Sequence, residues 1–247
     1  MSVLRLHGIS KSFGGLQALS DLTLAAEAGR ITGLIGPNGA GKTTVFNLIT
    51  GVFPPSAGSI FLEGQDLVGS RPHQIVRLGI ARTFQTPRLF RGMTVWEHVL
   101  VAQNHRAGRG PGLLLGGRRG QAAFREAQEA LDLVGLRDVR EGPAAALPYG
   151  DQRRLEIARA LATGPRLLLL DEPAAGMNPA ETDTLLRILE KVRAAGITLL
   201  LIEHDMSVVM TLCDRVVVLN FGEKIAEGTA AEVQSDPRVL EAYLGAD

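Results

Sequence analysis

Short apolar runs alternate with helical patterns along most of the chain, and this alternation predicts a mostly parallel sheet within an α/β fold. The strands are expected at residues 31–35, 59–64, 167–170, 197–202 and 215–220. Before residue 31 the pattern is weaker, which suggests a small N-terminal antiparallel sheet. The sequence has no internal repeat, so we expect a single domain over residues 1–247.

One amphipathic helix is expected directly after Lys42. Val45, Leu48 and Ile49 lie on one face of it, and Gly51 ends the pattern. A strand therefore leads into a helix across residues 36–42.

A second helix is expected to begin after Asn178. Asn178 fits the N-cap, Pro179 the first helical position and Glu181 the third, an arrangement close to a capping box. The apolar face of this helix consists of Leu185, Ile188, Leu189 and Val192.

Residues 88–163 interrupt the α/β alternation with a mainly helical pattern. Four apolar residues fall on one helical face there: Phe124, Ala127, Leu131 and Val134. We therefore expect a helical subdomain, 88–163, inserted in a core formed by residues 1–87 and 164–247. Within the insertion, the Gly- and Arg-rich stretch 107–120 is expected to be a loop.

Composition narrows the context without indicating an activity. The chain has 247 residues, enough to form a hydrophobic core without disulfides or structural metals. Its one cysteine, Cys213, permits no internal disulfide. The N-terminus lacks the charged head and long apolar run of a secretory signal. No apolar stretch approaches the roughly 20 residues that span a bilayer. We expect a soluble chain that meets a membrane through partners.

Charge is balanced overall but unevenly distributed. The formal net charge is zero, which argues against a nucleic-acid protein held by bulk charge. Residues 71–125 contain ten arginines, no lysine and one acid, Glu97, whereas the rest of the chain has 16 basic and 25 acidic residues. The basic segment is open to two explanations: attraction to anionic lipid headgroups, or pairing with carboxylates elsewhere in the chain.

The strongest local signal is GPNGAGKT, which fits the P-loop pattern G-x-x-x-x-G-K-[ST] between an apolar strand and a helix. Glycines let the backbone curl so that its amides point at phosphate oxygens, and the helix N-terminus adds positive potential. Lys42 supplies a charge to the terminal phosphates, and the Thr43 hydroxyl can bind Mg²⁺. The residues expected to bind ATP here are Gly36, Pro37, Asn38, Gly39, Ala40, Gly41, Lys42, Thr43 and Thr44.

A second signal is LLLLDEP, residues 167–173, where a buried strand ends in two adjacent carboxylates. Taken alone, an acidic pair at a strand end is usually a solvated turn or a helix cap. Downstream of a P-loop, a cation or a water network is the better explanation, because buried carboxylates are costly without one. We expect Asp171 to bind the metal and Glu172 to polarise the attacking water as general base.

Five further features resemble motifs of the ATP-binding cassette (ABC) family, in that family's order and over essentially the whole chain. LPYGDQRRLEIARAL, residues 147–161, resembles the ABC signature and its helix, and AAGMNP, residues 174–179, resembles the D-loop. Gln85 resembles the Q-loop glutamine, His204 the switch histidine and Phe13 the aromatic residue that stacks on adenine. The chain is therefore identified as a member of the ABC family, with the fold of its P-loop NTPase domain.

The resemblance implies that each ATP lies between the P-loop of one subunit and the signature of another. Tyr149, Gly150 and Asp151 would then bind the nucleotide of the opposing subunit. This signature departs from the common LSGGQ, because Pro148 stands in place of serine and Tyr149 in place of the first glycine. Proline lacks a backbone donor, so a weaker grip on the γ-phosphate is expected.

The resemblance also implies that Glu172, His204 and Gln85 are catalytic and that Gln85 joins Thr43 and Asp171 at the Mg²⁺. ATP would act as glue between the two subunits, and hydrolysis would loosen them. The residues downstream of Gln85, TPRLFRGMTV, would face a membrane subunit.

The segments ARTFQTPRLFRGMTVWEHVLVAQ, DEPAAGMNPAET and LIEHDMSVVM, with the ending AYLG, are similar to ATP-binding subunits of branched-chain amino acid importers. This similarity implies two membrane permease subunits, a second ATP-binding subunit in a homodimer or heterodimer, and indirectly an extracytoplasmic substrate-binding protein. It also implies a peripheral location at the cytoplasmic face of the inner membrane, without nucleic acid. The alternatives are an ABC ATPase for urea, amide or lipopolysaccharide transport, a soluble P-loop kinase, and an ABC protein acting on nucleic acid.

Overall fold

The structure is a computed structural model that describes residues 2–90, 92–103 and 118–244. Its strands are β1 (Ser2–Phe13), β2 (Leu16–Glu27), β3 (Ile31–Ile35), β4 (Ala57–Leu62), β5 (Gln65–Asp66), β6 (Ile80–Arg82), β7 (Leu167–Asp171), β8 (Thr198–Ile202), β9 (Arg215–Asn220) and β10 (Glu223–Gly228). Its helices are α1 (Lys42–Ile49), α2 (Pro72–Leu78), α3 (Val95–Ala102), α4 (Arg118–Val134), α5 (Tyr149–Ala162), α6 (Pro179–Ala194), α7 (Met206–Leu212), α8 (Ala230–Gln234) and α9 (Pro237–Leu244). Two 3₁₀ turns are η3 (Arg137–Val139) and η4 (Ala144–Ala146).

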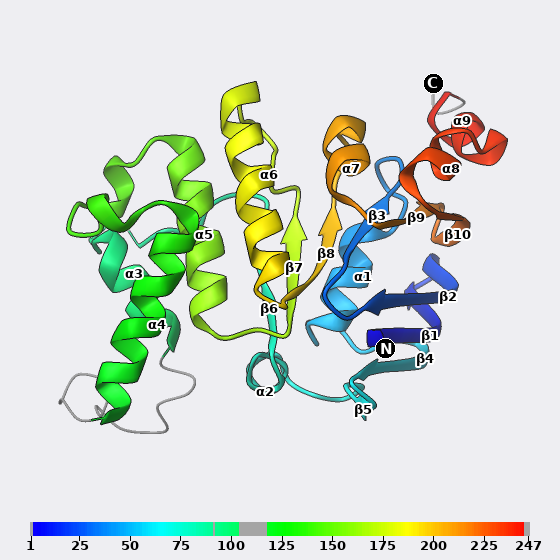
Figure 1. Ribbon diagram of the computed structural model, residues 1–247. Helices are drawn as coiled ribbons and strands as arrows, with labels where there is room; N and C mark the ends of the chain where they lie inside the picture. Colours follow the sequence, from blue (N-terminus) through cyan, green and yellow to red (C-terminus); the bar gives the residue numbers. More distant parts are fainter. Residues whose placement is uncertain (1, 91, 104–117, 245–247) are drawn as a thin grey trace.

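Within these described residues the strands form two sheets (Figure 1). The larger sheet has the order β10-β9-β3-β8-β7-β6, and its strands pair in parallel except for β10 with β9. The smaller, antiparallel sheet has the order β2-β1-β4-β5. The predicted α/β fold, with a mostly parallel core sheet and an N-terminal antiparallel sheet, is confirmed.

The larger sheet is covered on both faces, and strand β7 shows why its sequence is continuously apolar. Leu167 and Leu169 pack in the cluster that contains α1 and the antiparallel sheet. Leu168 and Leu170 pack in the cluster that contains α4, α5 and α6. Successive side chains of a strand point to opposite faces, so a strand covered on both sides needs apolar residues at every position.

Both helices predicted from apolar faces are present. In α1, Val45, Leu48 and Ile49 are buried between the two sheets. At the start of α6, Asn178 Oδ1 accepts from the Glu181 amide at 3.0 Å, and Glu181 Oε2 accepts from the Asn178 amide at 3.0 Å. This reciprocal pair is the capping box that the sequence indicated.

One strand prediction was wrong, and one strand was missed. Residues 59–64 were expected in the core sheet, but β4 covers residues 57–62 and pairs antiparallel with β1 in the smaller sheet. Strand β6, only three residues long, was not predicted, although it pairs with β7 and leads directly to Gln85. A short apolar run does not indicate which sheet its strand joins, because strands of the parallel and of the antiparallel sheet can have the same apolar pattern.

The helices α3, α4 and α5 lie together at one end of the molecule, at the left of Figure 1. On the predicted face of α4, Ala127, Leu131 and Val134 are buried, but Phe124 is half-exposed, with its ring 4.5 Å from that of Trp96. The predicted loop 107–120 lies outside the described residues up to 117, and its last three residues belong to α4. None of the helices in the described part of the chain is both long and apolar enough to cross a membrane.

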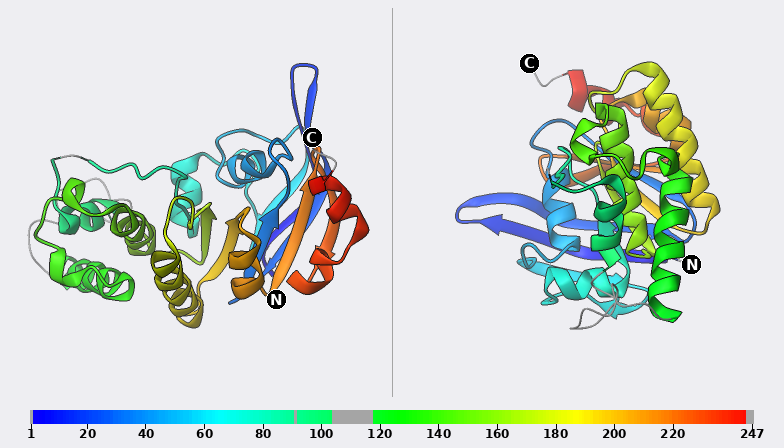
Figure 2. Two further views of the ribbon diagram at one scale, coloured as in Figure 1. Left: turned by 90° about the horizontal axis from the view of Figure 1, so that it is seen from above. Right: turned by 90° about the vertical axis from the view of Figure 1, so that its left-hand side faces the viewer.

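The β1–β2 hairpin projects from the body of the molecule in both views of Figure 2. Its turn places Phe13 and Leu16 at the tip, paired with each other across the two strands. The tip lies beside the entrance to α1, where Phe13 and Leu16 help to line one cavity with residues 38–44.

Candidate functional site

The P-loop joins β3 to α1, and it passes close to the backbone of β9 and β2. A Cβ at Gly36 would lie 2.1 Å from the Leu219 carbonyl oxygen, and one at Gly41 would lie 2.9 Å from the Ala18 carbonyl oxygen. Both glycines also have a positive φ, 148° and 101°. The loop therefore follows a path that side chains would block, and this path brings its amides to the N-terminus of α1, which has no side-chain cap.

Lys42 is buried, with 8% of its surface exposed, and its ammonium group is held by the loop itself. Nζ donates to the carbonyl oxygens of Gly36 at 2.7 Å and Pro37 at 2.9 Å. Burial lowers the pKa of Lys42, while the charges of Glu172 and Asp171 oppose that shift. The ammonium group is thus already desolvated and aimed along the loop where an anion would bind.

A cavity of about 490 Å³ opens in front of the loop. The predicted residues that line it are Phe13, Asn38, Gly39, Ala40, Gly41, Lys42, Thr43, Thr44 and Glu172. The Phe13 ring meets the Phe53 ring edge-on, with centroids 5.4 Å apart, and Lys11 Nζ lies 4.9 Å from the Phe13 centroid. The structure therefore gathers Phe13 and the expected phosphate-binding residues 38–44 around one space, whereas Gly36 and Pro37 do not line it. It adds Phe221, whose exposed ring also lines the cavity.

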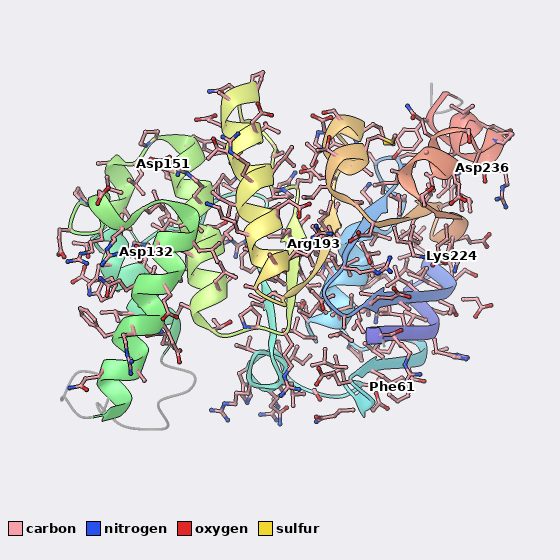
Figure 3. All side chains as sticks on the ribbon, in the orientation of Figure 1. Phe61, Asp132, Asp151, Arg193, Lys224 and Asp236 are labelled. Atoms are coloured by element: carbon pink, nitrogen blue, oxygen red, sulfur yellow. The ribbon has the colours of Figure 1, made fainter. Side chains whose placement is uncertain are left out.

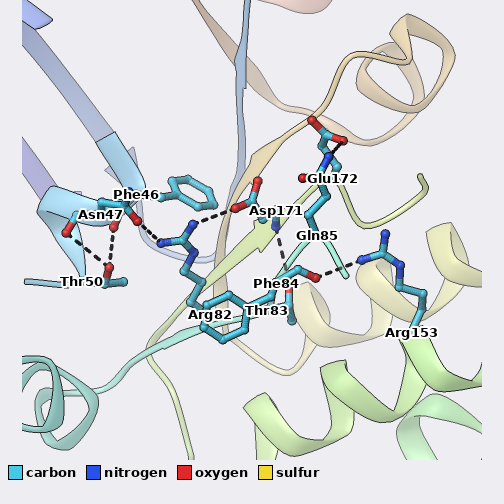
Figure 4. Close-up of polar contacts among 10 residues, drawn as sticks. All are labelled: Phe46, Asn47, Thr50, Arg82, Thr83, Phe84, Gln85, Arg153, Asp171 and Glu172. Atoms are coloured by element: carbon cyan, nitrogen blue, oxygen red, sulfur yellow. Dashed lines mark hydrogen bonds and ion pairs between the residues drawn. The ribbon is translucent and has the colours of Figure 1, made fainter. Parts of the chain in front are cut away.

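Asp171 lies buried at the end of β7 and is held by Arg82, which the sequence analysis did not single out (Figure 4). Arg82 Nη2 donates to Asp171 Oδ2 at 2.8 Å, and Nη1 donates to Asn47 Oδ1 on α1 at 2.7 Å. The guanidinium lies near the rings of Phe46 and Phe84. Arg82 thus connects the P-loop helix to the first of the two adjacent carboxylates, and one arginine of the basic segment pairs inside the fold.

Glu172 meets both other predicted catalytic residues. Gln85 Nε2 donates to Glu172 Oε2 at 2.7 Å, and His204 Nδ1 lies 3.8 Å from the same oxygen (Figure 4 shows the Gln85 contact). Glu172 itself has φ of 46°, in the left-handed region that a glutamate rarely adopts. Three loops, which follow β6, β7 and β8, converge on this carboxylate.

A buried carboxylate, Glu203, links two of these loops. Its Oε1 accepts from the Ala174 amide at 2.9 Å and its Oε2 from the His204 amide at 3.2 Å. Burial raises the pKa of Glu203, and these amide contacts oppose the shift. Glu203 therefore ties the segment after Glu172 to the segment that carries His204.

The predicted signature residues lie elsewhere. Gly150 and Asp151 line a separate cavity of about 250 Å³ with Met177, Asn178 and Glu181, and it shares no lining residue with the P-loop cavity. Figure 3 shows Asp151 toward the helical end of the molecule, far from Lys224 on β10. Tyr149 contacts residue 175 rather than the P-loop. Within one chain, the structure does not bring the signature to the P-loop.

A family model described as "ABC transporter" matches residues 19–175, and one described as "Branched-chain amino acid ATP-binding cassette transporter" matches residues 223–247. The high-affinity branched-chain amino acid transport ATP-binding protein LivG of Escherichia coli K12 is 47% identical, with 98% of each chain covered. The chain belongs to this family of ABC transporter ATP-binding proteins. As a family member it is an ATP-binding ATPase subunit, which excludes the soluble kinase alternative.

Other members of the family agree in sequence and in fold. The corresponding ATP-binding protein BraF of Pseudomonas aeruginosa is 44% identical, with 98% of each chain covered. Among solved structures, the ADP conformation of an ATP-binding cassette of an ABC transporter is 34% identical, with 99% of each chain covered and a TM-score of 0.88. A nucleotide-free cassette is 33% identical, covers 98% of this chain and 99% of its own, and has a TM-score of 0.87.

Three charged residues that shape the site, Arg82, Arg153 and Glu203, were not predicted as site residues from the sequence. Arg82 ends a short apolar strand, and an arginine at the end of a strand is expected to be exposed to solvent. Arg153 and Glu203 are likewise charged residues that the structure buries. Glu203 follows an apolar strand and Arg153 lies among other charged residues of α5, so the sequence does not indicate that either is buried until its partners in distant segments are known.

Proposed function

We propose that the chain powers a branched-chain amino acid importer by hydrolysing ATP in the P-loop cavity. The observation that carries the hydrolytic part is the convergence of Gln85 and His204 on Oε2 of Glu172, beside that cavity. The relatives described as branched-chain amino acid transport proteins support the cargo class. In this scheme residues 88–163 form a helical subdomain beside the core.

ATP binds mainly through its phosphates. The backbone N–H groups of residues 36–44, which Pro37 alone lacks, and the Lys42 ammonium group donate to the phosphate oxygens, and Phe13 stacks on the adenine. Stacking contributes about 1–3 kcal/mol, whereas micromolar affinity needs about 8 kcal/mol. The loop must therefore supply most of the binding free energy, which agrees with the fixed backbone and the pre-positioned ammonium group.

Thr43 on the wall of the cavity, together with Asp171 and Gln85 beside Glu172, fits a Mg²⁺ ion. Hydroxyl, carboxylate and amide oxygens are the ligands that Mg²⁺ prefers, and Thr43, Asp171 and Gln85 offer one of each. Gln85 donates to Glu172 through Nε2, so its amide oxygen is the atom suited to the metal. When bound, the ion would neutralise charge on the terminal phosphates. Arg82 holds Asp171 in place through one carboxylate oxygen, which leaves the other for the ion.

Glu172 acts as general base. Its carboxylate takes a proton from a water molecule that attacks the terminal phosphorus, the bond from that phosphorus to the bridging oxygen breaks, and ADP leaves; the Gln85 amide orients the carboxylate through Oε2. His204 is exposed and can turn toward the terminal phosphate from its place beside Glu172. A positioned general base contributes about 10²- to 10⁴-fold to a reaction rate.

Two chains complete the site. Because the signature and the P-loop line separate cavities, Tyr149, Gly150 and Asp151 can reach a nucleotide only across a dimer. The partner is a second ATP-binding subunit. A partner with a standard signature would offset the Pro148 and Tyr149 departure, and comparing ATPase rates of this chain alone and mixed with that partner tests this point.

The membrane subunits bind near the Q-loop. Phe84 and Phe90 are exposed on either side of residues 85–89, beside a cavity of about 160 Å³ that includes Glu156 and Arg159. Exposed aromatic side chains next to Gln85 suit a docking surface that reports to the site. We place two permease subunits there, with the chain at the cytoplasmic face of the membrane and an extracytoplasmic binding protein that delivers the cargo.

Replacement of Glu172 tests the hydrolytic assignment. Glu172→Gln should retain ATP binding and form a stable ATP-bound dimer, with turnover reduced about a hundredfold or more. ATP hydrolysis and light scattering in ATP and Mg²⁺ measure the two effects. Glu190→Gln, which makes the same change on the outer surface of α6, should behave like the wild type. Hydrolysis by Glu172→Gln at the wild-type rate would show that Glu172 is not the base.

Cargo is tested on the assembled transporter. In proteoliposomes, leucine, isoleucine or valine with the cognate binding protein should stimulate ATP hydrolysis, whereas urea or a simple amide should not. Stimulation by urea or an amide alone would refute the branched-chain assignment and leave the ATPase assignment intact.

A further inference from the structure

Arg153 on α5 is a charged residue with 4% of its surface exposed, and all three guanidinium nitrogens donate hydrogen bonds. Nη1 donates to the Phe84 carbonyl oxygen at 3.0 Å, Nη2 to the Ala175 carbonyl oxygen at 3.4 Å and Nε to the Tyr149 hydroxyl at 3.0 Å. Figure 4 shows the first of these contacts beside the Gln85–Glu172 pair. None of the three acceptors is a carboxylate, so this is no ion pair.

The two carbonyl groups belong to the loops that carry the proposed hydrolytic residues. Phe84 immediately precedes Gln85, and Ala175 follows Glu172 by three residues. Arg153 therefore fixes the distance between the loop after β6 and the loop after β7, close to the point where Gln85 and Glu172 meet. That contact is a 2.7 Å hydrogen bond between two side chains.

The same face of α5 holds the far end of the Q-loop. Glu156 Oε1 accepts from the Arg88 amide at 3.0 Å, and Arg159 Nη1 donates to the Arg88 carbonyl oxygen at 2.8 Å. Residues 84–88 are thus bound at both ends by α5. The contacts come from side chains at every third position of the helix, Arg153, Glu156 and Arg159. Of these contacts, those of Arg153 also reach the loop after Glu172.

Tyr149 explains why the unusual signature fits this arrangement. Its hydroxyl accepts from Arg153 Nε and donates to the Ala175 carbonyl oxygen at 3.3 Å. Its ring carbon Cε1 would lie 3.2 Å from a Cβ at residue 176, where the chain has glycine. The tyrosine therefore joins the start of α5 to the loop after β7, a connection that the glycine of a common signature could not make.

We propose that Arg153 is a positioning residue for ATP hydrolysis: with Tyr149, it holds the Q-loop and the loop after Glu172 in the register that joins Gln85 to Glu172. The proposal rests on the hydrolytic roles proposed for those two residues. Lysine cannot replace the arginine, because one ammonium group cannot reach three acceptors placed around a planar fork. Arg153 touches no part of the P-loop cavity, so it acts on turnover and leaves ATP affinity unchanged.

The first test is Arg153→Lys in the complete transporter complex. We expect kcat for ATP hydrolysis to fall about tenfold to a hundredfold, as small misplacements of catalytic groups commonly cause, with the Kd for ATP changed less than about twofold. Arg187→Lys is the matched control, because Arg187 lies on the exposed side of α6, where its Nη2 donates to the Thr184 hydroxyl at 3.1 Å. Unchanged kcat in Arg153→Lys, or a loss confined to ATP affinity, would overturn the proposal.

A double-mutant cycle shows whether Arg153 acts through Glu172. In the Glu172→Gln background, Arg153→Lys should have little further effect on the remaining hydrolysis, because the geometry it maintains is no longer used. The same fold-loss in both backgrounds would contradict positioning through Glu172. Tyr149→Phe removes one hydroxyl from a half-exposed ring and retains the fold, and it should lower kcat about threefold, again only when Glu172 is present.

The outcome also separates this inference from the proposed function. If the wild-type complex hydrolyses ATP and Glu172→Gln does not, while Arg153→Lys and Tyr149→Phe retain wild-type kcat, the inference fails and the proposed function stands. If Glu172→Gln retains full hydrolysis, the base assignment fails, and the inference fails with it.

Discussion

The P-loop and the signature turn both place the N-terminus of a helix at a proposed site for phosphate, but they are built in different ways. At the P-loop the backbone itself makes the shape, since Gly36 and Gly41 pass against carbonyl groups of other segments. At the signature turn side chains do so, because Arg153 and Tyr149 hold the start of α5 to two neighbouring loops. The first construction demands particular residue types, whereas the second tolerates a departure such as Pro148 if the network closes around it.

The largest expected effect tests whether the P-loop side also depends on a buried side chain. Arg82→Met should lower the free energy of unfolding by about 3–5 kcal/mol, because it leaves Asp171 buried without its cation and Asn47 without its donor. Urea unfolding measures the change. Arg166→Met, which breaks an exposed pair with Glu63, should cost less than about 1 kcal/mol. Equal losses would mean that the backbone alone sustains this side of the molecule.

The next largest effect is on ATP affinity, and it compares two residues proposed to bind the same nucleotide. Lys42→Ala should weaken ATP binding at least a hundredfold, about 3 kcal/mol, because it removes a desolvated charge from the phosphates. Phe13→Ala should weaken it about tenfold, near the lower end for lost stacking, since the ring is partly engaged with Phe53 and Lys11. Titration calorimetry with ATP and Mg²⁺ gives both affinities. A larger loss for Phe13→Ala would contradict a phosphate-dominated site.

The smallest effect concerns His98, a buried side chain of the helical end. Its Nε2 accepts from the Phe90 amide at 2.8 Å, so the neutral ring is the form that fits. Burial lowers the pKa of His98, and the charge of Arg159 adds to this, while the Thr94 carbonyl group and Glu97 oppose it. The unfolded chain, with a histidine pKa of about 6.5, then binds the proton more readily than the folded chain.

Stability should therefore be complete above about pH 6.5 and should fall as the pH drops toward the lowered pKa of the folded state. Urea unfolding of the wild type and of His98→Gln between pH 7 and pH 5 measures the difference in slope. Parallel pH dependences in the two proteins would exclude His98 as the titrating group.

The elements that sequence alone predicted are those whose pattern is complete within a few residues. Strands β3, β7, β8 and β9 are each predicted by an apolar run. Asn178 and Glu181 form the helix cap that their spacing predicted. Strand β4 was placed in the wrong sheet because its partner β1 is about fifty residues away, and a local pattern contains no information on pairing. Strand β6 was missed because three residues give no period.

The same distinction holds at the site. The P-loop residues were predictable, since the loop needs glycines where the backbone meets other carbonyl groups and a lysine at its end. Asp171 and Glu172 were predictable from their position after an apolar strand, and the structure brings Glu172 to Gln85 as the ABC resemblance implied. Arg82 and Arg153 were not, because their roles come from acceptors far away in the sequence, Asp171 for one and Phe84 with Ala175 for the other.

The left-handed backbone at Glu172 has a consequence for engineering. A glutamate in that conformation costs about 1–3 kcal/mol, which glycine would largely avoid. Mutagenesis guided by thermal tolerance alone would therefore enrich Glu172→Gly, and such a variant would be more stable but would lack the proposed base for hydrolysis. Directed evolution of this subunit toward heat resistance needs a turnover selection in every round, or it will discard the activity first.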